Sequence, residues 1–372
     1  MIISAITSLI LCATGAALNE NASFETLDGQ APAGWHAPDS GGVHWTMDKA
    51  GARTGDWQMA LSGAGAESNE WVYLYSDSFP VSTGDCVDFR AWVRSRGGPR
   101  NPLYVYAAGF LNGTWQPLPP MAQSAESKAW QADQWFSRGY SVFVPPGVEQ
   151  VRLELRAAAG ESPDATWFVD DFSCTVTSFK SYTEANSGKE RLKDIYLVGV
   201  DTLAQSRLGC YGAANVPTPN IDRMASEGML YEQVTAAAPW TKPSFASIQT
   251  GLHPSQHHVE NVDSVLAGDI ATLAESLKAR GYFTAAFVFS AYDGFLGPEM
   301  GMAQGFDVYF HSRLDEDNVT SAIQAFLETN AEALEVMNGG GLFLFHHIWE
   351  PHTPYVNRDP EKLPNEGVLG TV

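Results

Sequence analysis

The sequence predicts an amino-terminal all-β sandwich joined to an α/β domain built on a parallel sheet. Three observations predict this division. The chain has 372 residues, enough for two or three domains of ordinary size. Between residues 18 and 177, short runs of alternating polar and apolar residues are typical of antiparallel strands. Between residues 194 and 372, continuous apolar runs alternate with amphipathic helical segments, as in parallel α/β sheets.

The strands expected in the first half are rich in aromatic and β-branched residues. Gly, Pro, Asp and Asn separate them, which is the punctuation expected of turns. The runs are WVYLYSDSF (71–79), CVDFRAWVR (86–94), PLYVYAAGF (102–110), FSRGYSVFV (136–144), QVRLELRAA (150–158) and TWFVDDFSCTV (166–176). The polar segment 178–193 has no periodicity and is predicted to be a linker.

The second half alternates strand and helix signals. Helices are expected where a cap or a first-turn Pro opens an amphipathic run and where Gly closes it. The strands are expected at 194–200, 282–290 and 341–348, and the helices at 218–228, 271–281 and 318–337. The chain ends soon after the last of these strands, so we expect the carboxyl-terminal part of this domain to be missing.

The formal net charge is −21. A chain this acidic is not expected to bind nucleic acid or an anionic membrane surface, because such binding needs an excess of Lys and Arg. No run after the amino terminus approaches the roughly 18 apolar residues of a membrane span. Neither nucleic acid nor a membrane is therefore an expected partner.

The chain begins with an apolar run, MIISAITSLILCATGAA (1–17), that ends in small residues. This pattern indicates a secretory signal peptide and hence a periplasmic or extracellular protein, although no Lys or Arg precedes the run. A buried strand is the alternative. In an oxidising compartment Cys86 and Cys174 could pair, or they could remain two buried thiols.

Polar residues follow the ends of two predicted strands. Asp201 comes directly after the first strand, and ligands of parallel sheets bind at such ends. His346, His347, Glu350 and His352 lie in or just after the last strand, where imidazole and carboxylate groups could bind a metal or transfer protons. Side chains alternate along a strand, so at most one of His346 and His347 faces the site. His352, on a Pro-flanked loop, is the best candidate of the four.

Thr241 stands at the start of a short predicted helix in APWTKPSFASIQTG (238–251). Its hydroxyl could cap exposed backbone N–H groups. It could also be a nucleophile, with the attacked phosphate or sulfate held in the positive field of the helix. Spacing alone favours the cap.

Five segments in order resemble the sulfatase family of the alkaline phosphatase superfamily, over about residues 192–357. They are DIYLVGVDTLAQSRLGCYG (194–212), TPNIDRMASEGMLYEQVTAAAPWTKPSFASIQTGLHPSQHHV (218–259), GYFTAAFVFS (281–290), GMAQGFDVYF (301–310) and FLFHHIWEPHTPYV (343–356). The resemblance implies an alkaline-phosphatase-like sheet and a metal-dependent hydrolase of sulfate or phosphate esters.

The resemblance places Thr241 at the family's nucleophile position. There the family has Cys or Ser, any residue, Pro, Ser and Arg, and oxidises the first residue to formylglycine. Threonine cannot form formylglycine, so none is expected, and Thr241 would attack directly as in related branches of the superfamily. Phe245 replaces the arginine of this pattern.

The resemblance also implies a divalent cation, with calcium or magnesium preferred over manganese or zinc. Asp201 matches the first metal carboxylate and, with Thr241, would be a metal ligand, whereas Thr202 stands at the position of the second carboxylate. His352 matches the histidine near the leaving oxygen. Lys242 and His347 are further substrate-binding candidates.

The amino-terminal half resembles carbohydrate-binding jelly rolls through NASFETLDGQAPAGW (21–35) and WFVDDFS (167–173). This resemblance implies a structural calcium at Glu25 and Asp171, and sugar stacking on tryptophans such as Trp115 or Trp130. The alternative is that these aromatic residues are core and that the sandwich only supports the other domain.

Three functions remain open from the sequence. The first is a secreted sulfatase-type ester hydrolase that acts on a small-molecule or glycan ester. The second is a non-catalytic or degenerate glycan-binding protein, which the residues Thr202 and Phe245 motivate. The third is a phosphotransferase acting on glycan or lipid phosphates, which is compatible with an unmodified threonine.

Overall fold

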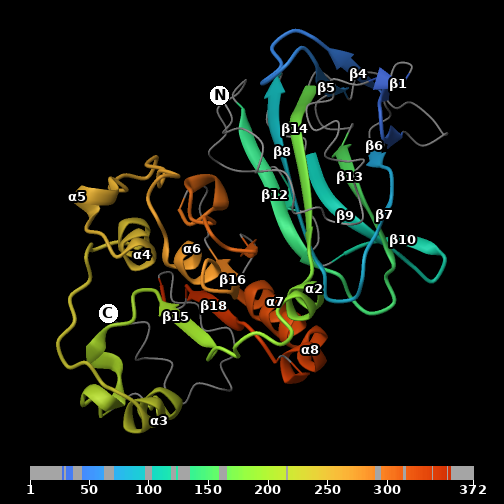
Figure 1. Cartoon of the computed structure of the whole chain (residues 1–372). Helices are drawn as coiled ribbons and strands as arrows, with labels where there is room; N and C mark the ends of the chain where they lie inside the picture. The colour runs from blue at the N-terminus through green and yellow to red at the C-terminus, as the bar shows by residue number, and fades with distance from the viewer. Residues whose placement is uncertain are drawn as a thin grey trace, which may run out of the picture.

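The computed structural model describes most of the chain in two packed halves, a β-sandwich and an α/β domain (Figure 1). The described residues are 27–28, 31–36, 44–62, 71–96, 103–118, 123–124, 135–158, 166–214, 217–289, 295–312, 316–336, 338–349 and 351–352. The predictions for the signal peptide (1–17), Glu25, Trp130 and Glu350 lie outside these residues.

The amino-terminal half contains two antiparallel sheets, as the alternating runs predict. One sheet has the order β10-β9-β13-β6-β3, with β11 paired to β9 and β7 paired to β13. Its strands are β3 (Trp35–His36), β6 (Trp71–Ser76), β7 (Phe79–Pro80), β9 (Leu103–Leu111), β10 (Thr114–Pro117), β11 (Gln123–Ser124) and β13 (Gln150–Ala158). The antiparallel strands predicted for this half are therefore confirmed in this sheet.

The other sheet has the order β12-β8-β14-β5-β4. Its strands are β4 (His44–Asp48), β5 (Gln58–Ser62), β8 (Cys86–Arg96), β12 (Phe136–Phe143) and β14 (Thr166–Thr177). A separate small pair joins β1 (Leu27–Asp28) to β2 (Ala31–Pro32). Residues such as Leu153, Val93 and Met59 point from the two sheets into one buried core.

The two cysteines of the sandwich are free thiols. Cys174 lies in the core of the sandwich, whereas Cys86 packs on the opposite side of its sheet against the α/β domain. Burial raises the pKa of the Cys86 thiol well above its ordinary value, so Cys86 stays protonated. The second of the two alternatives for this pair, two buried thiols, is the observed one.

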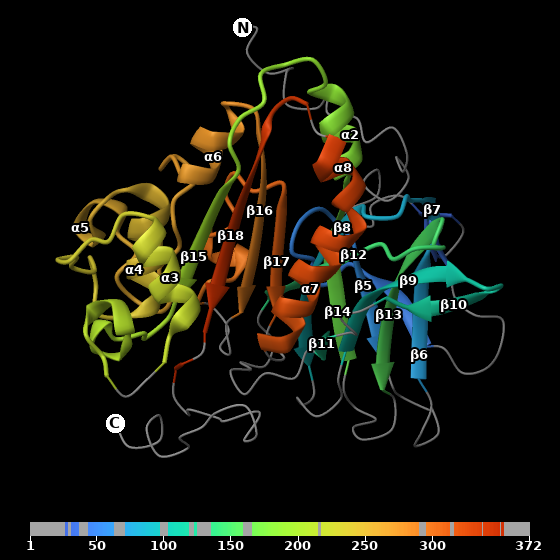
Figure 2. The ribbon, with the colours of Figure 1, turned by 90° about the horizontal axis from the view of Figure 1, so that it is seen from below.

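The carboxyl-terminal half contains the predicted parallel sheet, in the order β15-β18-β16-β17. Its strands are β15 (Ile195–Val200), β16 (Tyr282–Phe289), β17 (Val308–Ser312) and β18 (Gly341–Ile348). Helices α4 (Thr241–Thr250) and α6 (Leu273–Lys278) cover one face, and α7 (Glu316–Thr329) covers the other (Figure 2). The α/β fold class is confirmed.

Shorter elements complete this half. They are α3 (Pro219–Glu227), α5 (Pro254–His257), α8 (Ala331–Val336) and the 3-10 turns η1 (Gln205–Arg207), η2 (Gly209–Tyr211) and η3 (Pro298–Met300). Among the described residues, none of these helices is long and apolar enough to cross a membrane.

The segment predicted as a linker contains a helix, α2 (Phe179–Ala185). Ser178 caps it by accepting a hydrogen bond from the backbone N–H of Ser181, at 3.2 Å. Phe179 is buried against Phe283 and Phe326 of the α/β domain. The segment is therefore not an extended tether, because its first turn belongs to a packed core.

That core is shared by both halves of the chain. Phe143 of β12 stacks on Phe287 of β16, with ring centroids 5.8 Å apart, and also contacts Phe326 of α7. Side chains from the sandwich, from α2 and from the sheet thus form one hydrophobic cluster. The sandwich is packed against the α/β domain rather than hanging from it.

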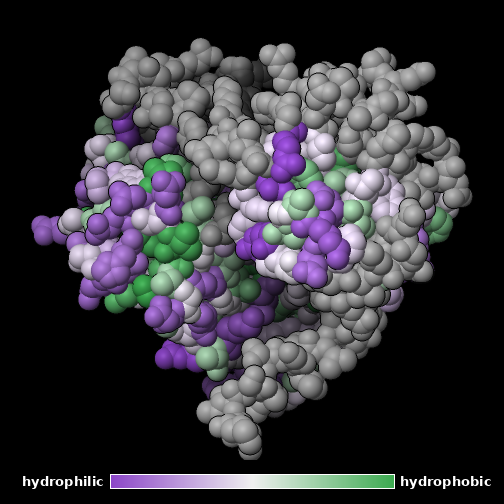
Figure 3. Space-filling view, turned by 90° about the horizontal axis from the view of Figure 1, so that it is seen from above, coloured by the Kyte–Doolittle hydropathy of each residue, from purple (hydrophilic) through white to green (hydrophobic). Residues whose placement is uncertain are grey.

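The α/β domain also exposes apolar side chains. Figure 3 shows the molecule from above, with the α/β domain on the left as in Figure 1. On that side, hydrophobic residues gather among hydrophilic ones. Exposed apolar residues of this domain include Tyr196 and Val198 on the edge strand β15, and Met224, Met229 and Val234 in and after α3.

Candidate active site

Asp201 is the first residue after β15, at the carboxyl end of the parallel sheet. Its backbone N–H donates a hydrogen bond to the carbonyl of Ile348, at 2.8 Å, and this bond continues the pairing of β15 with β18. The side chain is buried. The structure thus places Asp201 where ligands of parallel sheets bind, as the sequence predicts.

Thr241 is the first residue of helix α4 and lies against Asp201. Its hydroxyl donates a hydrogen bond to Asp201 Oδ2, at 2.8 Å. The capping alternative is wrong, because Trp240 is the residue at the cap position and no side chain caps this helix. The first turn of α4 has no side-chain cap, and Thr241 at its first position lies at the positive end of the helix dipole.

His347 is the third side chain that meets Asp201. It lies on β18 and is fully buried, with Nε2 3.6 Å from Asp201 Oδ2. Its neighbour His346 lies on the opposite face of the strand, as alternation predicts, together with Leu344. Only one of the two histidines therefore reaches the site.

Phe245 forms the apolar wall behind His347. The two rings meet edge to face, with centroids 4.8 Å apart and an interplanar angle of 89°. Gly199 on β15 leaves the space that Phe245 occupies, because a Cβ at Gly199 would lie 2.5 Å from Phe245 Cε1. A large aromatic residue at position 245 and a glycine at 199 thus belong to one packing arrangement.

The electrostatics of the site favour an ionised Asp201. Burial alone would raise the pKa of its carboxyl group. The nearby His347 ring and the Thr241 hydroxyl outweigh burial, with a smaller contribution from the charge of His352, and the pKa lies below its ordinary value of 3.8. Asp201 is therefore a carboxylate at neutral pH and can bind a cation.

His352 lies on the loop after β18. Its backbone N–H donates to the carbonyl of Trp349, at 2.9 Å, and its ring stacks on that of Trp349, with centroids 4.8 Å apart. Trp349 is in turn held edge-on by Phe289. This stack keeps the imidazole near the end of the sheet, close enough for its charge to act on Asp201.

Two other candidate residues have different surroundings. Lys242 is fully buried, and its Nζ contacts the carbonyl of Val262 and lies 3.2 Å from Met300 Sδ. Thr202 is exposed and has a φ of 56°, in the left-handed region. Its side chain therefore does not join Asp201 in the buried part of the site.

A second polar pair in α4 and α5 was not predicted from the sequence. Ser247 Oγ and His257 Nε2 are 2.9 Å apart and buried. The backbone N–H of Val259 donates to His257 Nδ1, so Nδ1 is an acceptor and the hydrogen lies on Nε2. His257 therefore donates to Ser247 and cannot act as its general base in this tautomer. Nothing in the spacing of the two residues signals this contact.

Asp171, the predicted calcium ligand, already has partners. One of its carboxylate oxygens accepts a hydrogen bond from Arg53 and the other accepts one from Thr54. Its φ of 46° coincides with an irregularity in the pairing of β14 with β8. The neighbouring Asp170 accepts hydrogen bonds from the same loop, through the backbone N–H of Arg53 at 2.8 Å. Asp171 thus has a cationic partner of its own.

The donor atoms available for a cation are those around Asp201. In the described part of the chain, no group of three or more His, Cys, Asp or Glu side chains is arranged to hold a metal ion. Asp201 and His347, with the hydroxyl of Thr241, are the closest approach to such a group in this site. Within the same described residues, neither ring nitrogen of His347 lies within hydrogen-bonding distance of a partner, and Nε2 comes nearest to Asp201 Oδ2, at 3.6 Å.

Comparison with known proteins identifies the family that the carboxyl-terminal half resembles. Residues 193–366 match the family model described as Sulfatase. The chain is similar to human iduronate 2-sulfatase (35% identity over 121 residues, 32% of this chain and 22% of that protein). It is also similar to an N-acetylgalactosamine-6-O-sulfatase of Bacteroides thetaiotaomicron (31% over 132 residues, 34% of this chain and 25% of that protein). The chain thus spans about a quarter of the length of these relatives.

Some solved structures are similar to part of this chain. A phosphonate monoester hydrolase of Agrobacterium radiobacter matches with a TM-score of 0.37 and 20% identity, covering 45% of this chain and 42% of that one. The CBM22-1 xylan-binding domain of Xyn10C from Paenibacillus barcinonensis matches with a TM-score of 0.30 and 18% identity, covering 42% of this chain and 92% of that one.

Proposed function

Because residues 193–366 are a sulfatase-family domain, we propose that the protein belongs to an ester hydrolase that cleaves sulfate or phosphate esters with Thr241 as the nucleophile. The observation that carries this proposal is the hydrogen bond from the Thr241 hydroxyl to Asp201 Oδ2 at the start of α4. It holds the oxygen at the positive end of a helix, where an anionic ester is favoured.

The residues suggest a two-step reaction. Thr241 Oγ1 would form a bond to sulfur or phosphorus while the bond from that atom to the leaving oxygen breaks. The Thr241 hydroxyl would lose its proton to water, since the lowered pKa of Asp201 makes that carboxylate a poor proton acceptor. His352 would give a proton to the leaving oxygen. Water would then release the covalent intermediate and restore Thr241.

Asp201 and Thr241 would hold a divalent cation, which would supply Lewis-acid polarisation of the ester and charge neutralisation. The lowered pKa of Asp201 supports this, because an ionised carboxylate is the ligand that cations require. Lys242 would contribute only positive field, since its side chain is buried beneath the first turn of α4.

The test compares the full chain with Thr241→Ala on p-nitrophenyl sulfate and p-nitrophenyl phosphate. We expect the variant to lose at least about a thousandfold in kcat, as when other enzymes lose their nucleophile. Thr250→Ala is the matched control, since Thr250 lies at the other end of the same helix and its hydroxyl donates to the carbonyl of Ala246. Equal turnover by wild type and Thr241→Ala would remove Thr241 from the chemistry.

The same assay separates hydrolysis from phosphotransfer. A phosphotransferase would pass the group from Thr241 to an alcohol, so added glycerol or a sugar would yield a phosphorylated product in place of inorganic phosphate. Product analysis by mass therefore decides between the two reactions. An exported enzyme, periplasmic or extracellular, is the proposed setting for either reaction.

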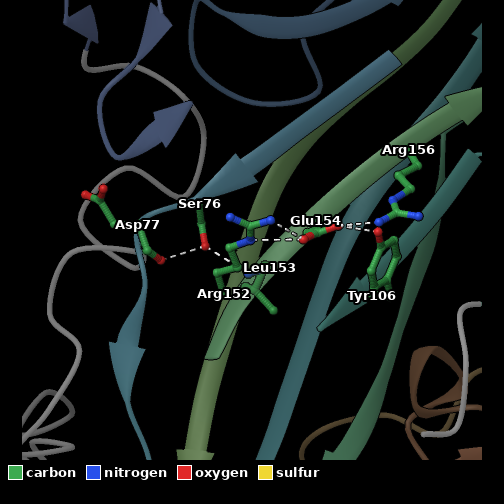
Figure 4. A network of polar contacts seen from close by, with 7 residues as sticks. All are labelled: Ser76, Asp77, Tyr106, Arg152, Leu153, Glu154 and Arg156. Carbon is green, nitrogen blue, oxygen red and sulfur yellow. Dashed lines mark hydrogen bonds and ion pairs between the residues drawn. The ribbon is translucent and has the colours of Figure 1, made fainter. Parts of the chain in front are cut away.

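A second candidate function, glycan binding by the sandwich, is favoured by one surface. On β13, Leu153 points into the core, so Arg152, Glu154 and Arg156 share the other face of the sheet, on the side away from the α/β domain (Figure 1). Figure 4 shows both arginines directed at Glu154, with Arg152 Nη2 2.7 Å and Arg156 Nη2 3.0 Å from its oxygens.

Aromatic rings flank this cluster. The Arg152 guanidinium lies 4.3 Å from the ring centroid of Tyr75 and 4.5 Å from that of Trp115, so it is stacked between them. Tyr106 donates its hydroxyl to Glu154 and lies under Arg156. Two arginines and one glutamate leave a local charge of about +1, which suits an anionic glycan.

Glycan binding is tested by affinity electrophoresis of the full chain in gels containing neutral or sulfated polysaccharides. Trp115→Ala should weaken retention, whereas Trp57→Ala, which removes a tryptophan next to Lys49 instead, should not. Equal retention of both variants would assign Trp115 to the core, which it also contacts.

A further inference from the structure

Trp349 holds the imidazole of His352 at the carboxyl end of the parallel sheet. The two rings are nearly parallel, with an interplanar angle of 17° and centroids 4.8 Å apart. The backbone N–H of His352 also donates to the carbonyl of Trp349, at 2.9 Å. A backbone hydrogen bond fixes where the side chain begins but leaves its torsions free. The stack is therefore the contact that sets the direction of the ring.

Phe289 supports the Trp349 ring from the core of the domain. It is the last residue of β16, is 3% exposed and belongs to the hydrophobic cluster that the two halves of the chain share. Its ring meets that of Trp349 at 60°, with centroids 5.2 Å apart, and Trp349 is itself partly buried against the same cluster. Packing of this kind can hold a functional group to within about half an ångström. The three rings thus connect a buried strand of the sheet to His352.

The direction of the His352 ring matters for the proposed reaction. His352 is close enough to Asp201 for the two charges to interact, and Asp201 accepts the hydroxyl of Thr241 at 2.8 Å. In that reaction His352 gives a proton to the leaving oxygen. A general acid works only when its N–H reaches the accepting oxygen at hydrogen-bond distance. A residue that aims the ring therefore acts on the rate without touching the substrate.

We propose that Trp349 is a positioning residue, which aims the imidazole of His352 at the leaving oxygen by stacking on it. The inference deepens the proposed function and rests on it. As the bond from sulfur or phosphorus to the leaving oxygen breaks, its electron pair stays on that oxygen. The proton of the charged His352 ring moves to the same oxygen, so an alcohol leaves and a neutral imidazole remains. Solvent then returns a proton to the ring.

The need for this proton depends on the leaving group. Nitrophenolate leaves readily as an anion, whereas the anion of a less acidic phenol or of a sugar hydroxyl does not. Loss of the aim of His352 should therefore slow the cleavage of esters of weakly acidic alcohols and spare esters of nitrophenol. General damage to the fold would slow the cleavage of both kinds of ester alike.

The test measures kcat and KM of the full chain for substituted phenyl sulfates and phosphates, from p-nitrophenyl to p-methoxyphenyl. We expect Trp349→Leu to lower kcat for the p-methoxyphenyl ester by at least about tenfold and for the p-nitrophenyl ester by less than about threefold, with KM near the wild-type value. Trp349→Phe keeps an aromatic face and should restore most of the rate. Phe306→Leu is the matched control, since Phe306 stacks on Phe343 in the same domain, with centroids 5.8 Å apart, and its loss should not change the leaving-group dependence.

A double-mutant cycle asks whether Trp349 acts through His352. If it does, Trp349→Leu combined with His352→Gln should cost no more than His352→Gln alone. Additive losses, or equal losses for both esters in folded Trp349→Leu, would overturn the inference. Nuclear Overhauser contacts between the Trp349 and His352 rings can be measured in the wild-type chain with carbon-13 in its histidines. Their absence would overturn the inference as well, even if Trp349→Leu does not fold.

The outcome is separable from that of the proposed function. If the wild-type chain releases neither sulfate nor phosphate from any of these esters, the hydrolase is rejected and the inference with it. If turnover depends on Thr241 but its leaving-group dependence is the same in wild type and Trp349→Leu, the inference alone is rejected.

Discussion

Replacing Gly199 by alanine tests whether Phe245 and the site are one packed unit. The added Cβ would lie 2.5 Å from Phe245 Cε1 and 2.9 Å from Cζ, and 3.7 Å from Phe345 Cε2. The Phe245 ring must then shift by about 1 Å to restore ordinary contacts, and the rings of His347 and Phe345 pack against it.

The magnitude follows from two opposing terms. Overpacking of a core costs roughly 1–3 kcal/mol. Replacing glycine in a strand returns about 0.5–1 kcal/mol of backbone entropy. We therefore expect Gly199→Ala to lower the free energy of unfolding by about 1–2 kcal/mol. In a Phe245→Leu background, which lacks the Cε1 and Cζ atoms, most of this cost should vanish.

The assay is a double-mutant cycle measured by urea unfolding, followed by circular dichroism and tryptophan fluorescence. We expect a coupling energy of about 1–2 kcal/mol between positions 199 and 245. Additive effects of the two substitutions would refute the reasoning, because they would mean that the ring relaxes without cost.

Two further predictions concern stability. Burial is the main cause that holds the pKa of His257 in the folded chain below the ordinary 6.5. Between the pKa of the folded state and that of the unfolded state, the unfolded chain therefore binds more protons than the folded chain. The contribution of His257 to the free energy of unfolding should be fully present above about pH 6.5 and should decline as the pH falls below this value. A difference in urea midpoint between wild type and His257→Gln that stays constant from pH 5 to pH 8 would contradict this. Phe179→Ala should cost about 3–5 kcal/mol, because Phe179 is 1% exposed at the junction of the two halves. The fluorescence and circular dichroism transitions report whether both halves lose stability together, and an effect near zero would mean that α2 is a loose connection after all.

The local elements could be read from the sequence because each depends on a short pattern. The alternating run 150–158 is an antiparallel strand in the structure, and the apolar runs 194–200 and 341–348 correspond to neighbouring parallel strands. Asp201 could be placed at the end of its strand for the same reason. The match to the sulfatase family over 193–366 confirms the resemblance that ordered segments had indicated.

The polar segment 178–193 shows where local patterns mislead. Its composition predicts a linker, yet α2 forms there because Phe179 is buried by residues about a hundred positions further along the chain. Phe179 and Tyr182, three positions apart, are too few to establish a helical period, so no local rule reports this burial. The tertiary contact outweighs the local preference.

By itself, the sequence determined the two fold classes, the position of Asp201 and the family position of Thr241. Only the tertiary structure decided that Thr241 bonds to Asp201 instead of capping its helix, and that His347, not His346, joins them. These contacts join residues 40 to 146 positions apart. Strand alternation predicts that two neighbouring histidines point to opposite faces of the sheet. Which of them meets the carboxylate depends on the face against which α4, with Phe245, is packed.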